Sequence, residues 1–432
     1  MACFDKNISI AIPGLYDVTL PRVARVRQKL SDQRVDDIAG EISRGIDALG
    51  GVTAKLKNKR IAVTGGSRGI ADYALIMRSL TAKLKEMGAE PFIVPAMGSH
   101  GGGTAEGQKK VLATFGITES SMEVPILSSM EVVTIGELPD GTKIYCDKYA
   151  WESDGIVLCN RVKAHTNFSG EWESGILKML SIGLGKHEGA TTAHRAGFEN
   201  FYKYIPDAGN FFLSLGKILF GVATVENGHE QVMRLDVIAP ENIAEREREL
   251  LVIAKKNMAR LPFAQLDILF VDEIGKNISG SGMDRNVIGR PFGEPLPGMP
   301  SIGCIGVTGL SKETSGSAVG IGIAEIVTRD VVEQIDLAPT YINHITAGSV
   351  RGAAIPLVAK DDEEAVRIAL YTVPAKASGK SATFARIRNT LMLDEFEVSE
   401  NMLPALRERA DIFTILEKPR PMRFISGKLD RI

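Results

Sequence analysis

The chain has 432 residues, a length beyond the size of most single hydrophobic cores, so two domains are expected. Hydrophobic residues make up 44% and charged residues 24%, which is the balance of an ordinary globular protein. The 51 Lys and Arg residues nearly balance the 53 Asp and Glu residues, so charge gives no reason to expect nucleic acid or an anionic membrane as a partner. A small molecule is therefore the expected partner.

The cysteines and the first residues indicate a cytoplasmic protein. Residues 1–6 lack the charged start and apolar run of a secretory signal. The longest apolar stretch, residues 211–225, is interrupted by Lys217 and is too short to span a bilayer. The cysteines form no Cys-x-x-Cys pair and are typical of reduced thiols, so no structural zinc is expected: Cys3, Cys146, Cys159 and Cys304. Whether the chain forms a homo-oligomer stays open.

Three short apolar and β-branched runs in the first half have the pattern of buried strands: residues 60–64, 91–95 and 155–159. A helical pattern follows the first run over residues 73–87, and Thr104 is a candidate N-cap for the helix after the second. Each run leads into a loop that carries Gly, Ser, Arg or His. Because ligands of open α/β sheets bind outside the carboxyl ends of strands, these three loops predict the site.

The second half begins after a long charged helical pattern over residues 240–261, which is predicted to connect two domains. A strand pattern at residues 266–271 opens the second domain. The sequence therefore predicts an α/β protein of two α/β domains, residues 1–264 and 265–432, with the active site in the cleft between them.

The loop after the first strand resembles the dinucleotide-binding loop of short-chain dehydrogenases, since it reads Val-Thr-Gly-Gly-Ser-Arg-Gly-Ile over residues 63–70. Ala71 replaces the third glycine of that loop, and no tyrosine has a lysine four residues on. A Gly-rich turn of this kind either binds an anion or is a plain tight turn. Arg68 favours anion binding, because a guanidinium grips a carboxylate or phosphate at two points.

Residues 181–187, Ser-Ile-Gly-Leu-Gly-Lys-His, superficially resemble a Walker loop. The first glycine is missing at the required spacing, and Lys186 is followed by His187 in place of Ser or Thr. We therefore discard an NTPase function.

Histidines gather in the predicted site. Of the six in the chain, four lie in the strand-end loops or the segment just after them: His100, His165, His187 and His194. A lone histidine is more often structural than catalytic, but two at successive strand ends favour a catalytic site. Imidazole has a pKa of about 6.5, which suits proton transfer at neutral pH, and it also binds nickel and zinc.

The order of these motifs resembles the lactate racemase family. Gly98-Ser-His100 is similar to the family's Gly-x-His segment at the start of a helix. Lys163-Ala-His165 is followed by Gly175-Ile-Leu-Lys178, Gly183 and His194, and the sixteen positions from Lys178 to His194 are the most specific part of the match. Ser67-Arg68 lies where the family has an Arg-bearing loop. The second domain matches only in length and general α/β character.

This resemblance implies a racemase or epimerase that inverts the carbinol carbon of a small 2-hydroxy acid. The cofactor implied is a nickel-pincer nucleotide (nickel pyridinium-3,5-bisthiocarboxylic acid mononucleotide). His100 and His165 would be the paired acid/base residues on opposite faces of the substrate. Lys178 would hold the cofactor, covalently in some relatives, beside the Gly66-Ser67 loop. His194 would be the protein ligand to nickel.

The resemblance also implies substrate contacts. Arg68 would orient the substrate, and Lys276 in the second domain is a candidate contact for its carboxylate; His187 is a rival metal ligand. The chain departs from the family pattern at Gly65 and Gly69, at Gly101-Gly102, and in a small insertion over residues 171–173. Because these changes lie close to the expected substrate position, a different or larger hydroxy acid is at least as good a candidate substrate as lactate.

Two other functions remain open. A nicotinamide-dependent oxidoreductase would use the loop that follows Gly65. A non-catalytic homologue would bind a metallo-nucleotide and leave every hydroxy acid unchanged.

Overall fold

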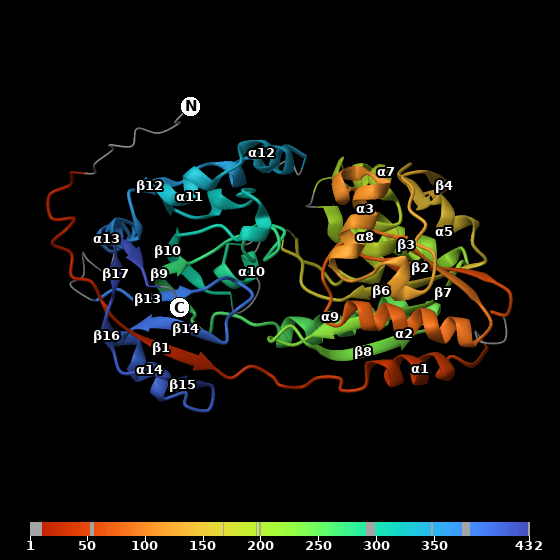
Figure 1. The fold of residues 1–432 in the computed structure, drawn as a ribbon, viewed down its shortest axis with the longest axis horizontal. Coiled ribbons are helices and arrows are strands. Elements are labelled where there is room, and N and C mark those ends of the chain that lie inside the picture. Colours follow the sequence, from red (N-terminus) through yellow and green to blue (C-terminus); the bar gives the residue numbers. More distant parts are fainter. Residues whose placement is uncertain are drawn as a thin grey trace. The chain divides into compact units, whose positions relative to one another are not determined.

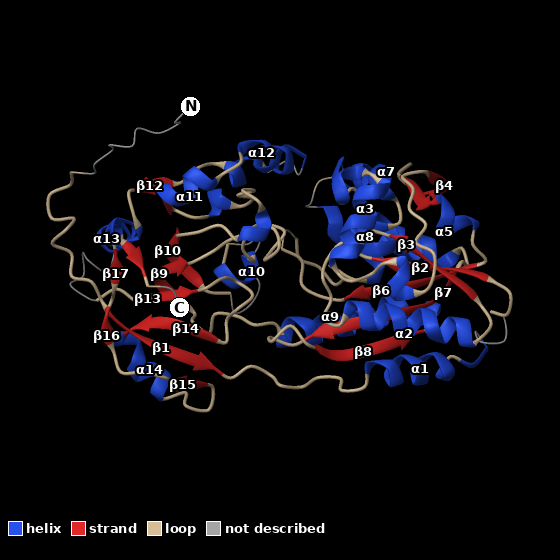
Figure 2. Cartoon of the chain, in the orientation of Figure 1, coloured by secondary structure: helices blue, strands red, loops and turns tan. Residues whose placement is uncertain are grey.

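The computed structural model describes residues 11–51, 56–166, 168–195, 197, 200–290, 299–346, 349–373 and 381–430. The chain divides into two compact units. The central unit comprises Ser31–Met258, and the terminal unit comprises Met1–Leu30 together with Ala259–Ile432. Figure 1 colours the chain along its sequence, and Figure 2 shows that each unit combines helices and strands, as the predicted α/β class requires.

The division differs from the predicted boundary between residues 264 and 265, because the first residues of the chain join the C-terminal part. The reason is β1 (Arg22–Gln28), which pairs antiparallel with β14 (Glu395–Ser399). Val26 of β1 is fully buried in the core of the terminal unit. The predicted cleft concerns the placement of one unit against the other and stays a prediction.

The central unit is built on a five-stranded sheet in the order β3-β2-β6-β7-β8. The first four strands are parallel and the last is antiparallel. Their bounds are β3 (Glu90–Pro95), β2 (Arg60–Gly65), β6 (Gly155–Arg161), β7 (Ile218–Glu226) and β8 (Val232–Ile238). Because parallel strands end at one edge, the loops after β2, β3 and β6 lie at the same edge of the sheet.

Helices cover both faces of this sheet, which is the usual arrangement around parallel strands. Along β2, Ile61 and Val63 pack into one core and Ala62 into the other. The first face is covered by α1 (Ile38–Ala48), α2 (Tyr73–Glu86), α3 (Ala105–Thr114) and α4 (Glu119–Met122). The second is covered by α5 (Lys148–Glu152), α6 (Ile176–Lys178), α7 (Lys186–Arg195), α8 (Phe201–Ser214) and α9 (Ile243–Asn257). A separate antiparallel pair consists of β4 (Val132–Glu137) and β5 (Lys143–Asp147).

The terminal unit contains a mixed sheet in the order β12-β11-β10-β9-β13-β14-β1-β15, and β16 also pairs with β1. Its remaining strands are β9 (Gln265–Val271), β10 (Ser301–Val307), β11 (Ile326–Thr328), β12 (Leu357–Ala359), β13 (Phe384–Ile387), β15 (Phe413–Ile415) and β16 (Arg420–Pro421). A small pair is formed by β17 (Phe424–Ile425) and β18 (Lys428–Leu429). Its helices are α10 (Arg285–Ile288), α11 (Arg329–Gln334), α12 (Leu337–Thr346), α13 (Asp362–Thr372) and α14 (Leu403–Arg407).

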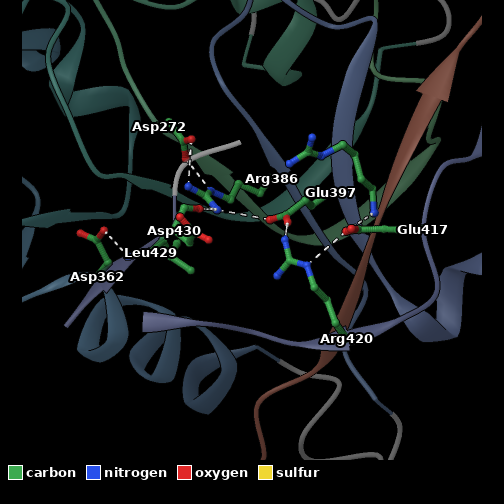
Figure 3. A network of polar contacts seen from close by, with 9 residues as sticks. Asp272, Asp362, Arg386, Glu397, Glu417, Arg420, Leu429 and Asp430 are labelled. Carbon is green, nitrogen blue, oxygen red and sulfur yellow. Dashed lines mark hydrogen bonds and ion pairs between the residues drawn. The ribbon is translucent and has the colours of Figure 1, made fainter. Parts of the chain in front are cut away.

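A network of buried charges crosses the sheet of the terminal unit (Figure 3). The Arg386 guanidinium donates to both carboxylate oxygens of Asp272, at 2.6 and 3.0 Å, and to Glu397 at 3.2 Å. Arg420 donates to the other oxygen of Glu397. Arg386 is 2% exposed, so its charge is balanced almost entirely inside the protein.

Several predicted elements are confirmed. The helical pattern at residues 73–87 is α2, and the Thr104 hydroxyl accepts a hydrogen bond from the Gly107 amide at 3.1 Å as the N-cap of α3. The charged pattern at residues 240–261 contains α9, which packs on the central core instead of only connecting the units.

Cys146, Cys159 and Cys304 are buried free thiols, and Cys3 lies outside the described residues. Among the helices of the described segments, none is long and apolar enough to cross a membrane.

Candidate functional site

The predicted site residues of the central unit follow three neighbouring parallel strands. Arg68 follows β2, His100 follows β3 and His165 follows β6. A backbone hydrogen bond of 3.0 Å from Gly98 to the Gly183 carbonyl ties the loop of His100 to the segment after Lys178. The sheet therefore gathers motifs that are far apart in the sequence.

Aromatic rings link His165, Lys178 and His194. The His165 ring lies 4.3 Å from the ring of Phe168, and the Lys178 ammonium lies 5.9 Å from the same ring. Phe168 packs edge-on against Phe201 at 5.4 Å, and Phe201 lies 5.5 Å from the His194 ring. Three predicted site residues thus border one apolar surface, which lowers the local polarity around them.

That environment disfavours charge on the basic groups. Burial, together with the nearby Arg68 and Lys163 charges, lowers the pKa of Lys178 to about 7. Burial and the Lys178 charge lower the pKa of His165 well below its ordinary value, and the same two causes lower the pKa of His194. At neutral pH both imidazoles are neutral and able to accept a proton, and Lys178 has a substantial fraction of nucleophilic amine.

His100 is held in one tautomer by the backbone. Its Nδ1 lies 2.8 Å from the Met97 carbonyl oxygen, which can only accept a hydrogen bond. The ring proton of the neutral form therefore resides on Nδ1, and Nε2 is the basic nitrogen. The side chain is partly buried.

The Gly101-Gly102 departure has a structural cause. Gly101 and Gly102 adopt φ values of +68° and +67°, in the left-handed region. Proline fixes φ near −65° and could not adopt this conformation. A β-carbon at Gly101 would also lie 2.5 Å from the Gly107 backbone. This turn therefore favours glycine at the two positions where the chain departs from the family pattern.

The residue 171–173 insertion anchors the His165 loop to α9. Buried Glu173 accepts hydrogen bonds from the His165 amide at 2.6 Å and the Gly170 amide at 3.0 Å. Its carboxylate also pairs with Lys255 of α9 at 2.6 Å. The Trp172 indole donates to the Ala244 carbonyl at 2.7 Å. The insertion thus fixes the backbone that carries a predicted acid/base residue, a role that sequence reasoning missed.

A second residue of α9 supports Lys178. The Glu247 carboxylate is 1% exposed and accepts a hydrogen bond of 2.9 Å from the Leu177 amide at the start of α6. Burial raises the pKa of Glu247 to about 7. Glu247 shares the inward face of α9 with Leu250, Leu251 and Ala254. The helical periodicity of the sequence would have predicted that Glu247 faces the core.

The loop after β2 reaches the Lys178 segment. The Gly66 amide donates to the Tyr73 hydroxyl at 2.5 Å, and a β-carbon at Gly66 would contact Met179 and Asn160 at 3.5 Å. Ser67 is partly buried and Arg68 is exposed. The roles predicted for this loop in holding cofactor and substrate stay predictions.

The start of α2 argues against the nicotinamide alternative. Near the helix start, the Ala71 amide donates to the Glu226 carboxylate at 2.7 Å, and Glu226 also pairs with Arg161. A dinucleotide-binding loop presents this amide region to a pyrophosphate. In this chain the Glu226 carboxylate already accepts a hydrogen bond from that region, and it would repel the pyrophosphate.

The remaining candidate ligands of the sequence have other surroundings. Lys276 belongs to the terminal unit, where its ammonium donates to the Asn343 side chain, and its contact with substrate stays a prediction. His187 is exposed at the start of α7. His344 accepts from the Gly320 amide at 3.1 Å inside the terminal unit. Within the described segments, no three His, Cys, Asp or Glu side chains converge as a metal site.

One segment of the chain matches a known protein domain. Residues 37–203 match the model of the lactate racemase N-terminal domain. This segment is therefore similar to the N-terminal domain of lactate racemases, as the order of the sequence motifs predicted. The matched segment contains every predicted site residue except Lys276. The comparison with curated proteins gives no match.

A solved structure shares the fold. It is the lactate racemase apoprotein from Thermoanaerobacterium thermosaccharolyticum, which aligns over 89% of this chain and 96% of its own. The TM-score is 0.55 at 15% sequence identity. At that identity the likeness shows the fold, and it agrees with two α/β domains.

Proposed function

We propose that the chain inverts the carbinol carbon of a small 2-hydroxy acid, with a nickel-pincer nucleotide as its cofactor. The observation that carries this proposal is the pairing of His165 and Lys178, both with lowered pKa, on the aromatic surface that also borders His194. Perturbed basic groups that lie together at the carboxyl edge of a sheet are typical of an active site.

The residues present suit such a cofactor. Lys178 offers an amine with a pKa of about 7, and His194 offers an imidazole in the last turn of α7. The Gly66-Ser67 loop lies beside the Lys178 segment and would contact the nucleotide. When bound, the cofactor would accept a hydride from the carbinol carbon and return it.

The protein would supply the proton transfers and the placement of substrate. Inversion requires two bases on opposite faces of the carbinol carbon, and the loops after β3 and β6 carry one each, His100 and His165. One imidazole removes the hydroxyl proton on one face of the carbinol carbon. The other imidazole returns a proton to the oxygen on the opposite face. Arg68 would hold the carboxylate, with Lys276 as a second proposed contact, so that the planar keto acid does not leave.

The test uses protein produced with the cofactor and a panel of enantiopure 2-hydroxy acids, each followed by chiral chromatography. We expect one acid to racemise or epimerise. His100→Ala and His165→Ala should each lower the rate by about 10²–10⁴-fold while nickel content is kept. His229→Ala is the control, because His229 pairs with the exposed Asp32 and has no role in the proposed reaction. A nickel-loaded wild-type protein that changes none of the acids would contradict the proposal.

A further inference from the structure

Lys186 is a fully buried lysine at the end of the discarded Walker-like segment. Its ammonium pairs with the Asp147 carboxylate at 3.1 Å, and both side chains have an exposed fraction of 0%. The ammonium also donates to the Gln108 side-chain oxygen at 3.0 Å and to the Pro95 carbonyl at the end of β3. A phosphate-binding lysine would need a side chain that a ligand can reach. Lys186 therefore has a different role.

Gln108 extends this contact to the loop of His100. Gln108 is fully buried in α3, and its side-chain amide donates to the Gly98 carbonyl at 2.8 Å and the His100 carbonyl at 3.3 Å. Lys186 fixes the orientation of that amide, because the ammonium can only donate and so selects the oxygen of Gln108. The two side chains thus hold the His100 turn at its first and last residues.

The backbone of Lys186 supports a specific role for its side chain. Lys186 adopts a φ of +52°, in the left-handed region that favours glycine. A residue with a β-carbon persists there only where the surrounding contacts determine it. Replacing a buried ion pair with apolar residues is often neutral for stability, so burial alone does not explain the pair.

We propose that Lys186 and Gln108 are positioning residues for His100. They fix the turn at residues 98–100, and with it the orientation of the imidazole. The catalytic importance of that orientation rests on the proposed function. The positioning itself can be measured in protein that carries out no reaction.

The first experiment follows the histidine ring signals by NMR in protein with ring-labelled histidine. His100→Ala assigns the His100 signals. Gln108→Leu removes both donors to the turn, and Gln108→Glu keeps an oxygen for Lys186 but cannot donate to the turn carbonyls. We expect both variants to shift the His100 ring signals and to leave those of His165 and His194 unchanged. Gln231→Leu is the control, since Gln231 contacts Asn227 in a different loop.

The second experiment measures steady-state rates of the nickel-loaded protein with the hydroxy acid that it inverts. Both Gln108 variants should lower kcat by about 10- to 100-fold with little change in KM, because misplacement of a reacting group by about 1 Å has this effect. They should also shift the pH profile of kcat. Lys186→Met should act in the same direction. It also leaves Asp147 buried without its partner and so lowers stability, which is why the Gln108 variants carry the test.

The outcomes separate this inference from the proposed function. Unchanged His100 signals in both folded Gln108 variants would overturn the positioning role, whatever the activity. A wild-type protein that inverts no hydroxy acid would remove the proposed function and leave the NMR result to decide the positioning.

Discussion

The sheet of the terminal unit and the strand-end loops of the central unit differ in how they arrange charge. In the terminal unit, Arg386 lies between Asp272 and Glu397, and each charge has a partner of opposite sign (Figure 3). In the central unit, the strand-end loops bring the positive side chains of Arg68, Lys163 and Lys178 near one another. The acidic group nearby is Glu173, which already pairs with Lys255.

This difference separates a structural network from a binding site. A paired buried charge fixes the geometry of the fold, and it is costly to break. A cluster of like charges raises the free energy of the empty site, and an anionic ligand would relieve that cost. The carboxylate of a hydroxy acid and the phosphate of a nucleotide are anions of this kind.

The largest expected effect on stability is in the terminal unit. Arg386→Met would leave Asp272 and Glu397 buried without their partner, and we expect a loss of about 3–5 kcal/mol in the free energy of unfolding. Urea denaturation followed by circular dichroism measures it. Arg27→Met is the control on β1, because Arg27 pairs with Glu395 at the surface and should cost no more than about 1 kcal/mol. Equal losses in the two variants would refute the structural role of the network.

A smaller effect is expected from Glu247, and it depends on pH. The folded pKa of about 7 lies above the ordinary value of 4.5, so the folded protein binds an extra proton between these values. Stability from this group therefore falls as pH rises from 4.5 to 7. The free energy of unfolding of Glu247→Gln, relative to that of the wild type, should therefore be higher at pH 8 than at pH 5. The expected change in this difference is roughly 1–3 kcal/mol. Melting temperatures at the two pH values measure it, and an equal difference at both would contradict the raised pKa.

The smallest expected effect on stability is at Lys178. Lys178→Met removes a charge that burial and neighbouring cations disfavour, so the free energy of unfolding should stay within about 1 kcal/mol of the wild type or rise. The same urea experiment measures it. The variant should nevertheless lose its nickel when produced with the cofactor. A loss of stability as large as that of Arg386→Met would mean that Lys178 is structural and would remove the contrast between the two units.

Local patterns predicted the framework of the site. The strands at residues 60–64, 91–95 and 155–159 are the cores of β2, β3 and β6, because buried parallel strands are continuous apolar runs. Strand β1 could not be found in this way. Its partner β14 lies more than 300 residues away, and the pairing depends on tertiary structure.

The site itself was predicted only in part. Histidines at strand ends and the family resemblance indicated His100, His165 and Lys178. The residues that hold them, Glu173 and Gln108, act through contacts across the fold that no local spacing reveals. Lys186 shows the limit most clearly, because its sequence context resembled a phosphate loop and the fold buries it against Asp147.

The most direct test of the account is the nickel content per chain of protein produced in a host that makes the nickel-pincer nucleotide. We predict about one nickel per wild-type chain, an unchanged content in His100→Ala, and a sharp drop in His194→Ala. No nickel in the wild type despite a demonstrated supply of the cofactor, or full nickel in His194→Ala, would contradict the assignment of Lys178 and His194 as the residues that hold the cofactor.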